Sequence, residues 1–317
     1  MSIPERLRER MANAPALFHK NDGWTMLAAD ADSIIYKVAA TTKTLETAKR
    51  RFVSEALTLH FLADAALTRL HLTPKHCRKA GRFTIIAHKP YQGNRKNSVK
   101  PSLVEPLRYA VGREQLVLPP ELQIVFNDVY EADDSVVMDC HTYGDAAIYY
   151  SEDKDLDCLR NKKLCQKTSQ ILPAVPSNSL GTLEIVELSA SKKVAGRGPL
   201  FFWAQMLMGD TADNIQGITR AYGKLCGPVK AYELLEGFIY STSPTAELEL
   251  ATFVLGLYMD NNQNPWPEAW LLWLYPKDKY TFANYLKDLG LLSCNTALSV
   301  WLNGMMRTQW FDKRIKI

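Results

Sequence analysis

Three clusters of acidic residues stand out in the middle of the chain. They are Glu131, Asp133 and Asp134; Asp153 and Asp155; and Asp210 and Asp213. Each cluster falls where a strand or helix is expected to begin or end. Carboxylates held this close repel one another and lose hydration when they are partly buried, so a fold that gathers them needs a compensating charge. Hard divalent cations such as Mg²⁺ or Mn²⁺ prefer oxygen ligands, and the pattern therefore indicates a divalent-metal site.

The apolar pattern around these clusters predicts the elements that position them. Residues 24–29 form an apolar run that ends at Asp30, which is typical of a buried strand with that carboxylate at its carboxyl end. A core-facing helix is expected over 45–67, because its apolar residues recur at spacings of three and four. Beyond residue 120 the expected elements alternate, as strand 122–126, helix 133–140 and strand 146–150. This alternation favours an α/β layer with a largely parallel sheet, in which Asp30, Glu131 and Asp153 converge at one edge.

The stretch 65–104 contains no Asp or Glu, although it is rich in basic side chains. The basic residues are Arg69, Lys75, Arg78, Lys79, Arg82, Lys89, Arg95, Lys96 and Lys100, and Tyr91 lies among them. Gly81, Pro90 and Gly93 interrupt any single regular element, so the segment is expected to leave the core. Such a segment is typical of a surface that binds a polyanion, whereas a solvated basic loop without a partner is the plainer interpretation. The neighbouring acidic clusters favour the polyanion.

The second half of the chain is expected to be mainly helical. Residues 170–188 contain prolines and a glycine and indicate a hairpin or an irregular connection, with a boundary near Val194. Two glycine turns follow, at Gly217 and Gly227, each beside an expected helix. Glycine lets the backbone approach a phosphate, and amides at the next helix N-terminus can donate to it. The alternative is an ordinary connection between helices with a C-cap glycine.

Composition sets broader limits. The 317 residues suffice for one large domain or two ordinary ones, and an apolar fraction of 47% is enough for a core. We find no charge-free apolar run of about 18 residues and no basic-then-apolar leader after Met1, so neither a membrane span nor export is expected. The six cysteines are scattered without a CxxC pair, which argues against a zinc module and a disulfide framework. We therefore expect a protein of the cytoplasm with reduced thiols.

Several motifs, taken in order, carry a resemblance to a known family. They are the strand-end Asp30, YQGNRK at 91–96, EADD at 131–134, SEDKD at 151–155, GDTADNIQGI at 209–218 and CGPVKA at 226–231. Together they resemble the 5′-nuclease or flap-endonuclease superfamily, and within it the 5′-to-3′ exonucleases of bacteriophages. The ending WFDK at 310–313 also resembles the phage branch. The resemblance implies an enzyme that hydrolyses phosphodiester bonds near the 5′ end of DNA, in phage DNA replication or degradation.

The resemblance also implies a domain organisation and a metal content. Residues 1–194 would form a PIN-like α/β nuclease domain with a basic helical arch over about 73–104. Residues 195–317 would form a helical region with a helix-hairpin-helix motif over about 209–236. Two ions, Mg²⁺ or Mn²⁺, about 4 Å apart would activate the attacking water and stabilise the departing 3′ oxygen. The implied ligands are Asp30, Glu131, Asp133 and Asp134 for the first ion, and Asp153, Asp155, Asp210 and Asp213 for the second.

The contacts to nucleic acid are implied in the same way. Arg95 and Lys96 would act as catalytic cations at the scissile phosphate, and Tyr91 would stack on a base. The implied DNA-binding residues are Lys75, Arg78, Lys79, Arg82, Lys89, Tyr91, Arg95, Lys96, Gly217, Gly227 and Lys230. The glycine turns would hold the duplex backbone, with a bound K⁺. The implied partner is DNA with a free 5′ end, as duplex, overhang or flap, or an RNA–DNA hybrid, and the protein is expected to be a monomer in the host cytoplasm with no membrane attachment.

Two positions depart from the family pattern. Thr73 stands where the family has a further metal-binding Asp at the end of the second strand, so the first metal would bind less tightly or a water would fill the gap. Gln92 stands where relatives often have a lysine, for which Lys89 or Lys96 could compensate. The departure at Thr73 leaves open a non-catalytic DNA-binding homologue with a weakened metal site.

A phosphatase of the haloacid-dehalogenase type is the other alternative. Asp30 and Asp32 after a strand, with Asp210 and Asp213 further on, loosely mimic its motifs. That mechanism requires Asp30 to attack phosphorus directly. It leaves the basic segment without a purpose, and it needs Asp210 at a strand end although the preceding residues are expected to be helical.

Overall fold

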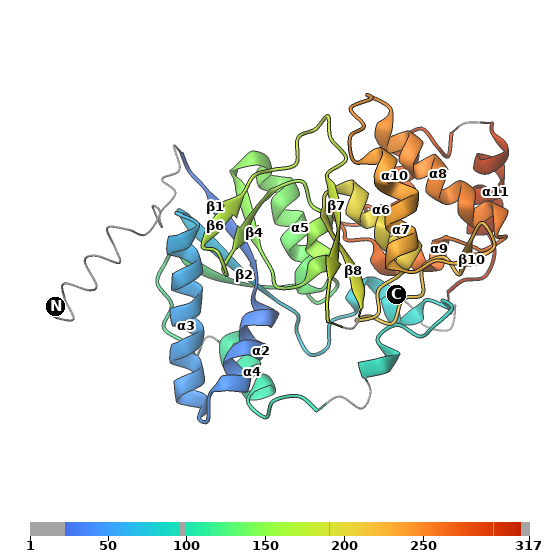
Figure 1. The fold of residues 1–317 in the computed structure, drawn as a ribbon. Coiled ribbons are helices and arrows are strands. Elements are labelled where there is room, and N and C mark those ends of the chain that lie inside the picture. The colour runs from blue at the N-terminus through green and yellow to red at the C-terminus, as the bar shows by residue number, and fades with distance from the viewer. Residues whose placement is uncertain (1–22, 96–98, 114, 190, 294, 312–317) are drawn as a thin grey trace.

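The computed structural model describes residues 23–95, 99–113, 115–189, 191–293 and 295–311. Its centre is a six-stranded sheet (Figure 1). The strands follow one another in the order β3-β2-β1-β4-β5-β6. The strands are β1 (Met26–Asp30), β2 (Leu67–Leu72), β3 (Leu122–Phe126), β4 (Ala147–Tyr150), β5 (Lys162–Cys165) and β6 (Gln170–Leu172). All neighbouring pairs are parallel except β5 and β6, which are antiparallel. The expected α/β fold with a mostly parallel sheet is confirmed.

Helices cover both faces of this sheet. They are α2 (Ala31–Thr41), α3 (Leu45–Leu62), α4 (Val104–Gly112) and α5 (Ala132–Tyr143). Side chains alternate between the faces of a strand, and β1 shows the consequence. Leu27 and Ala29 join the core beneath α2, α3 and α4, whereas Met26 and Ala28 join the core beneath α5. All four side chains are fully buried, so β1 is the central strand of a sheet with two covered faces.

This topology brings the ends of several strands to one edge. Asp30 is the last residue of β1 and caps α2, and α5 begins shortly after β3. β4 is followed by a 3₁₀ helix, Lys154–Cys158, for which Asp153 is the N-cap. Because β1 and β4 are parallel neighbours, the residues after them lie side by side at the carboxyl edge of the sheet.

The basic segment between β2 and α4 differs from the expected helical arch. Its described residues form two 3₁₀ helices, Lys79–Thr84 and Gly93–Arg95, rather than a long helix. Positive φ angles at Lys79, Ala80 and Gly81 break the first of them. The segment then packs along the C-terminal helices, where Ile86 N–H donates to Trp310 O at 2.8 Å. The segment was expected to leave the core, but Ile85 and Ala87 pack against the core of the C-terminal helices.

The rest of the chain is mainly helical and lies beside α5, in the yellow, orange and red part of Figure 1. Its helices are α6 (Pro199–Met208), α7 (Pro228–Leu235), α8 (Ala246–Asp260), α9 (Trp266–Leu272), α10 (Phe282–Asp288) and α11 (Ala297–Met306). Two antiparallel hairpins accompany them, β7 (Thr182–Glu187) with β8 (Lys192–Arg197), and β9 (Arg220–Ala221) with β10 (Lys224–Leu225). The boundary expected near Val194 falls inside β8, and the helical region begins at Pro199. No helix among the described residues is both long and apolar enough to cross a bilayer.

The α6–α7 connection is where a helix-hairpin-helix was expected. Between the two helices the chain forms an acidic loop that begins at Gly209 and ends at Gly217, and then the short β9–β10 hairpin. Gly209 and Gly217 both have positive φ, and a Cβ on Gly217 would lie 2.3 Å from the Gly209 backbone nitrogen. Only glycine fits such a close crossing, so the two residues close the loop at its base.

Candidate metal centre

Six carboxylates gather at the carboxyl edge of the sheet. They come from the end of β1 (Asp30), the first turn of α5 (Asp133), the connection after β4 (Asp153 and Asp155) and the loop after α6 (Asp210 and Asp213). Burial and the charges of Asp30 and Asp153 raise the pKa of Asp133 well above its ordinary value. Four segments that are distant in the sequence thus form one acidic basin.

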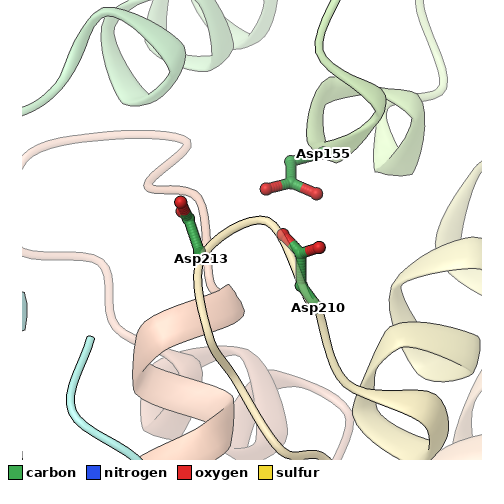
Figure 2. A group of neighbouring side chains, drawn as sticks. All are labelled: Asp155, Asp210 and Asp213. Atoms are coloured by element: carbon green, nitrogen blue, oxygen red, sulfur yellow. The ribbon is translucent and has the colours of Figure 1, made fainter. Parts of the chain in front are cut away.

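Asp155, Asp210 and Asp213 form the tighter half of the basin, which we call the second cluster. One carboxylate oxygen from each lies within 4.8 Å of the others, and the side chains point toward a common centre (Figure 2). Burial, followed by the charge of Asp153, raises the pKa of Asp155 to about 7. The Oδ2 atom of Asp210 is buried and has no hydrogen-bond partner among the described residues. An orphaned carboxylate oxygen inside an acidic cluster fits a divalent cation.

Asp30, Asp133 and Asp153 form the other half, the first cluster. Burial and the charge of Asp32 raise the pKa of Asp30 to about 7. Asp30 accepts hydrogen bonds from Asp32 N–H at 3.0 Å and from Ser151 Oγ at 2.9 Å. The charge of Asp153 raises the pKa of Asp30, Asp133 and Asp155 alike, so Asp153 belongs to the first cluster and is also close to Asp155 of the second.

Asp134 and Arg82 form a buried ion pair away from this basin. The two carboxylate oxygens of Asp134 accept from Arg82 Nη1 and Nη2 at 2.7 and 2.8 Å, and they also accept from the backbone N–H groups of Glu131 and Tyr275. Asp134 is 0% exposed and Arg82 2% exposed. These contacts use the full accepting capacity of the carboxylate. Both residues therefore differ from the expectation, because the Asp134 oxygens are engaged within the protein and the Arg82 side chain is buried in an ion pair.

Glu131 is also engaged by neighbouring side chains. Its carboxylate lies 2.8 Å from Lys79 Nζ and 3.1 Å from Arg82 Nη1, and it accepts from Tyr91 OH at 3.0 Å. Burial alone would raise the pKa of Glu131, but Arg82 and Lys79 outweigh burial and lower it. Glu131 therefore stays ionised. It lies beside the basin and contacts the cations of both Lys79 and Arg82.

The segment 90–95 clamps the acidic loop after α6. Tyr91 is only 8% exposed, and its hydroxyl donates to Asp213 Oδ2 at 3.2 Å as well as to Glu131. Gln92 Nε2 donates to Asp213 Oδ1 at 3.2 Å, and its Oε1 accepts from Lys79 Nζ at 3.1 Å. Arg95 is exposed and pairs with Asp213. The ring of Tyr91 is thus packed inside the protein, contrary to the expectation that it stacks on a base.

The contacts of Thr73 account for the threonine at this position, where the family pattern has an aspartate. Its Oγ1 accepts from Ala132 N–H at 2.9 Å, so the hydroxyl satisfies an N-terminal amide of α5. Its backbone N–H donates to Asp32 Oδ2 at 3.1 Å, and Asp32 also pairs with Arg108 at 2.8 Å. Thr73 therefore serves the start of α5 and holds Asp32 rather than a metal.

The remaining expected DNA contacts are spread over the surface. Lys75, Arg78 and Lys89 are exposed, whereas Lys96 lies outside the described residues. Gly227 caps α7, and Lys230 in that helix pairs with Glu233 at 3.1 Å. Gly217 is buried at the base of the acidic loop, which suits a packing role better than a direct contact.

Sequence reasoning did not identify two residues that orient the carboxylates. Ser151 Oγ donates to Asp30 and accepts from Asp153 N–H at 2.9 Å, which links the two strand ends. Gln205 Nε2 donates to Asp155 Oδ1 at 2.6 Å. Gln205 did carry a signal, because it is the one polar side chain in the otherwise apolar α6 sequence PLFFWAQMLM. A buried polar side chain on a core helix needs a partner.

Comparison with solved structures identifies the fold of this chain. No protein-family model matches the chain, and no curated protein sequence matches it. The solved 5′-exonuclease of bacteriophage T5 with bound divalent metal ions (zinc) has a TM-score of 0.50 and 14% identity, covering 90% of this chain and 98% of that one. The chain thus has the fold of the T5 5′-exonuclease over most of its length, which confirms the resemblance at the level of the fold.

Two further solved structures score lower. A T5 flap endonuclease in a pseudo-enzyme–product complex with DNA and metal ions has a TM-score of 0.45 and 13% identity, over 84% of this chain and 97% of that one. The catalytic core of Rad2 with a DNA substrate has a TM-score of 0.38 and 11% identity, over 93% and 82%.

Proposed function

We propose that this chain is a divalent-metal-dependent 5′ nuclease that hydrolyses phosphodiester bonds near a 5′ end of DNA. One observation carries the proposal. Carboxylates from four separate segments meet at the carboxyl edge of a sheet that has the T5 5′-exonuclease fold. This edge is where open α/β sheets bind their ligands, and a basic segment runs directly beside it. A haloacid-dehalogenase mechanism finds no support, because Asp210 follows a helix rather than a strand.

The donor set suits hard cations. Asp30, Asp133 and Asp153 would hold one ion, and Asp155, Asp210 and Asp213 would hold the other. Such ions would supply an activated water and stabilise the departing 3′ oxygen. All six groups are carboxylates, and an open acidic basin of this kind favours Mg²⁺ or Mn²⁺ over softer metals.

The protein's own side chains would orient these groups and place the substrate. Ser151 and Gln205 fix the carboxylates of Asp30 and Asp155 before substrate arrives. Arg95 is exposed beside the second cluster, where its cation would contact the phosphate that reacts. The exposed Lys75 and Lys89 would contact the DNA backbone without reading its sequence.

A labelled duplex with a 5′ overhang tests the proposal. We expect Mg²⁺-dependent release of short products from the 5′ end, and we expect EDTA to abolish it. Asp155→Asn should lower the rate by about 100-fold or more with little change in DNA affinity, because the carboxylate acts on the reaction rather than on binding. Asp145→Asn, at an exposed position away from the basin, is the matched control. Intact DNA under saturating binding would point to a non-catalytic DNA-binding protein, and full activity of Asp155→Asn would place the site elsewhere.

A further inference from the structure

Lys154 lies on the second cluster. It stands in sequence between Asp153 and Asp155, and its Nζ is 2.7 Å from Asp210 Oδ1 and 3.2 Å from Asp155 Oδ1. Its side chain is 43% exposed, whereas that of Asp210 is 1% exposed. The ammonium therefore approaches from the solvent side and covers a buried carboxylate. It contacts two of the three groups that would hold a divalent ion.

The two clusters differ in their charge balance. In the second cluster, Lys154 pairs with Asp155 and Asp210, and Arg95 pairs with Asp213. In the first cluster, Asp30 accepts only from a hydroxyl and a backbone amide, and no ion pair to Asp30 or Asp133 is found in the part of the chain that the structure describes. The protein itself thus offsets two of the three negative charges of the second cluster, whereas ion pairs offset none of those on Asp30 and Asp133 among the described residues.

Lys154 brings a positive charge to two carboxylates of the second cluster. An ammonium held on the Oδ1 atoms of two carboxylates repels a divalent ion that approaches the same groups. Removal of Lys154 should therefore favour metal binding.

We propose that Lys154 is an internal counter-ion of the second metal site, held on Asp155 and Asp210 until a divalent ion displaces it, so that the first cluster fills at lower metal concentration. The inference rests on the proposed function, because it concerns the same basin. Displacement requires no unfolding, since the half-exposed side chain can turn toward solvent. The weaker of the two metal affinities is then set by a lysine as well as by the carboxylates.

Mn²⁺ binding to the full chain without DNA tests this role, with the free Mn²⁺ signal followed by electron paramagnetic resonance. We expect Lys154→Met to raise the affinity of the weaker site by about tenfold or more, because the competing charge is gone. Lys192→Met is the matched control, since it removes the same charge from a 2.9 Å ion pair with Glu187 on the β7–β8 hairpin. Lys154→Gln serves as a second variant, and circular dichroism verifies folding. Adding Asp210→Asn should abolish the gain.

Three results would overturn the role of Lys154. The first is a weak-site affinity in both Lys154 variants that stays within about twofold of the wild type. The second is a gain that persists in the Asp210→Asn background. In either case, cutting of the 5′-overhang duplex by the wild type in Mn²⁺ would leave the proposed function standing. The third is the absence of both Mn²⁺ binding and cutting by the wild type, which would overturn the two proposals together.

Discussion

At the scale of single residues, the pairing of Arg82 with Asp134 makes two expected site residues part of the core. Removing the arginine would leave a buried carboxylate without its cation, which typically costs about 3 to 5 kcal/mol. We expect Arg82→Met to lower the free energy of unfolding by that amount in urea titrations. Arg78→Met, at an exposed site nearby, should change it by less than about 0.5 kcal/mol. An Arg82→Met protein that is fully stable but binds DNA more weakly would show instead that Arg82 contacts DNA.

A second residue-scale prediction concerns the aromatic side chain that can stack on a base. Tyr91 is buried, whereas Phe83 packs edge-on against it at 5.4 Å between ring centroids and is 56% exposed. Stacking of a base on an aromatic ring contributes about 1 to 3 kcal/mol, so Phe83→Ala should weaken binding of a 5′ single strand by that amount. Fluorescence anisotropy measures the loss. Phe61→Ala, with a 58% exposed ring on α3, is the control. If the two variants bound the single strand with equal affinity, Phe83 would not be part of the surface that binds DNA.

At the scale of elements, the loop that carries Asp210 and Asp213 depends on the crossing of Gly209 and Gly217. Gly217→Ala adds a methyl group 2.3 Å from a backbone nitrogen at a φ of +69°. Gly223→Ala is a matched control, because its φ is +75° but nothing lies within 4 Å of the added carbon. The strained φ alone costs about 1 to 2 kcal/mol, and only Gly217→Ala must also move the loop. We expect thermal unfolding to show a larger loss for Gly217→Ala, together with weaker Mn²⁺ binding. Equal effects of the two substitutions would contradict this account.

The sequence was informative about elements whose side chains follow a clear period. The strand 122–126 was predicted with its observed bounds, and β1, α5 and β4 were each placed within a few residues, because buried alternation and helical spacing are local signals. The arch was predicted less well. The packing of segment 79–95 depends on Arg82 meeting Asp134, and no local pattern reveals a partner 52 residues away.

The candidate site shows the same limit. Acidic clusters at strand ends pointed to the basin, since parallel strands bring their carboxyl ends together. The sequence does not show which carboxylates are available to bind a metal. Asp133 and Asp134 are adjacent in the sequence, but only Asp133 faces the basin. The first turn of α5 directs Asp133 to the basin and Asp134 to Arg82. That division follows from helical geometry combined with a contact that only the tertiary structure supplies.

At the scale of the whole molecule, Glu268 makes stability depend on pH. It lies in α9 and is 2% exposed, and burial raises its pKa from 4.5 to about 7, although the N–H groups of Glu268 and His88 partly oppose the shift. Between these values the unfolded chain releases the proton while the folded chain keeps it. The free energy of unfolding therefore falls as pH rises from about 4.5 to about 7, by at most about 3 kcal/mol.

Glu268→Gln removes this loss. We expect the variant to be more stable than the wild type at about pH 8, by up to about 3 kcal/mol, with the advantage gone near pH 4.5. Asp30 and Asp155 titrate in both proteins, so the difference between the two urea-unfolding profiles isolates Glu268. Glu249→Gln, on the exposed side of α8, is the control. Parallel pH profiles for Glu268→Gln and the wild type would show that Glu268 is ionised in the folded protein.

The central claim is that one acidic basin, assembled from four segments, holds divalent ions. Anomalous diffraction from crystals grown with Mn²⁺ tests it most directly. We expect Mn²⁺ peaks beside the second cluster of Asp155, Asp210 and Asp213 and beside the first cluster of Asp30, Asp133 and Asp153. A map with no peak in the basin at saturating Mn²⁺, or with peaks only at other carboxylates, would contradict the account.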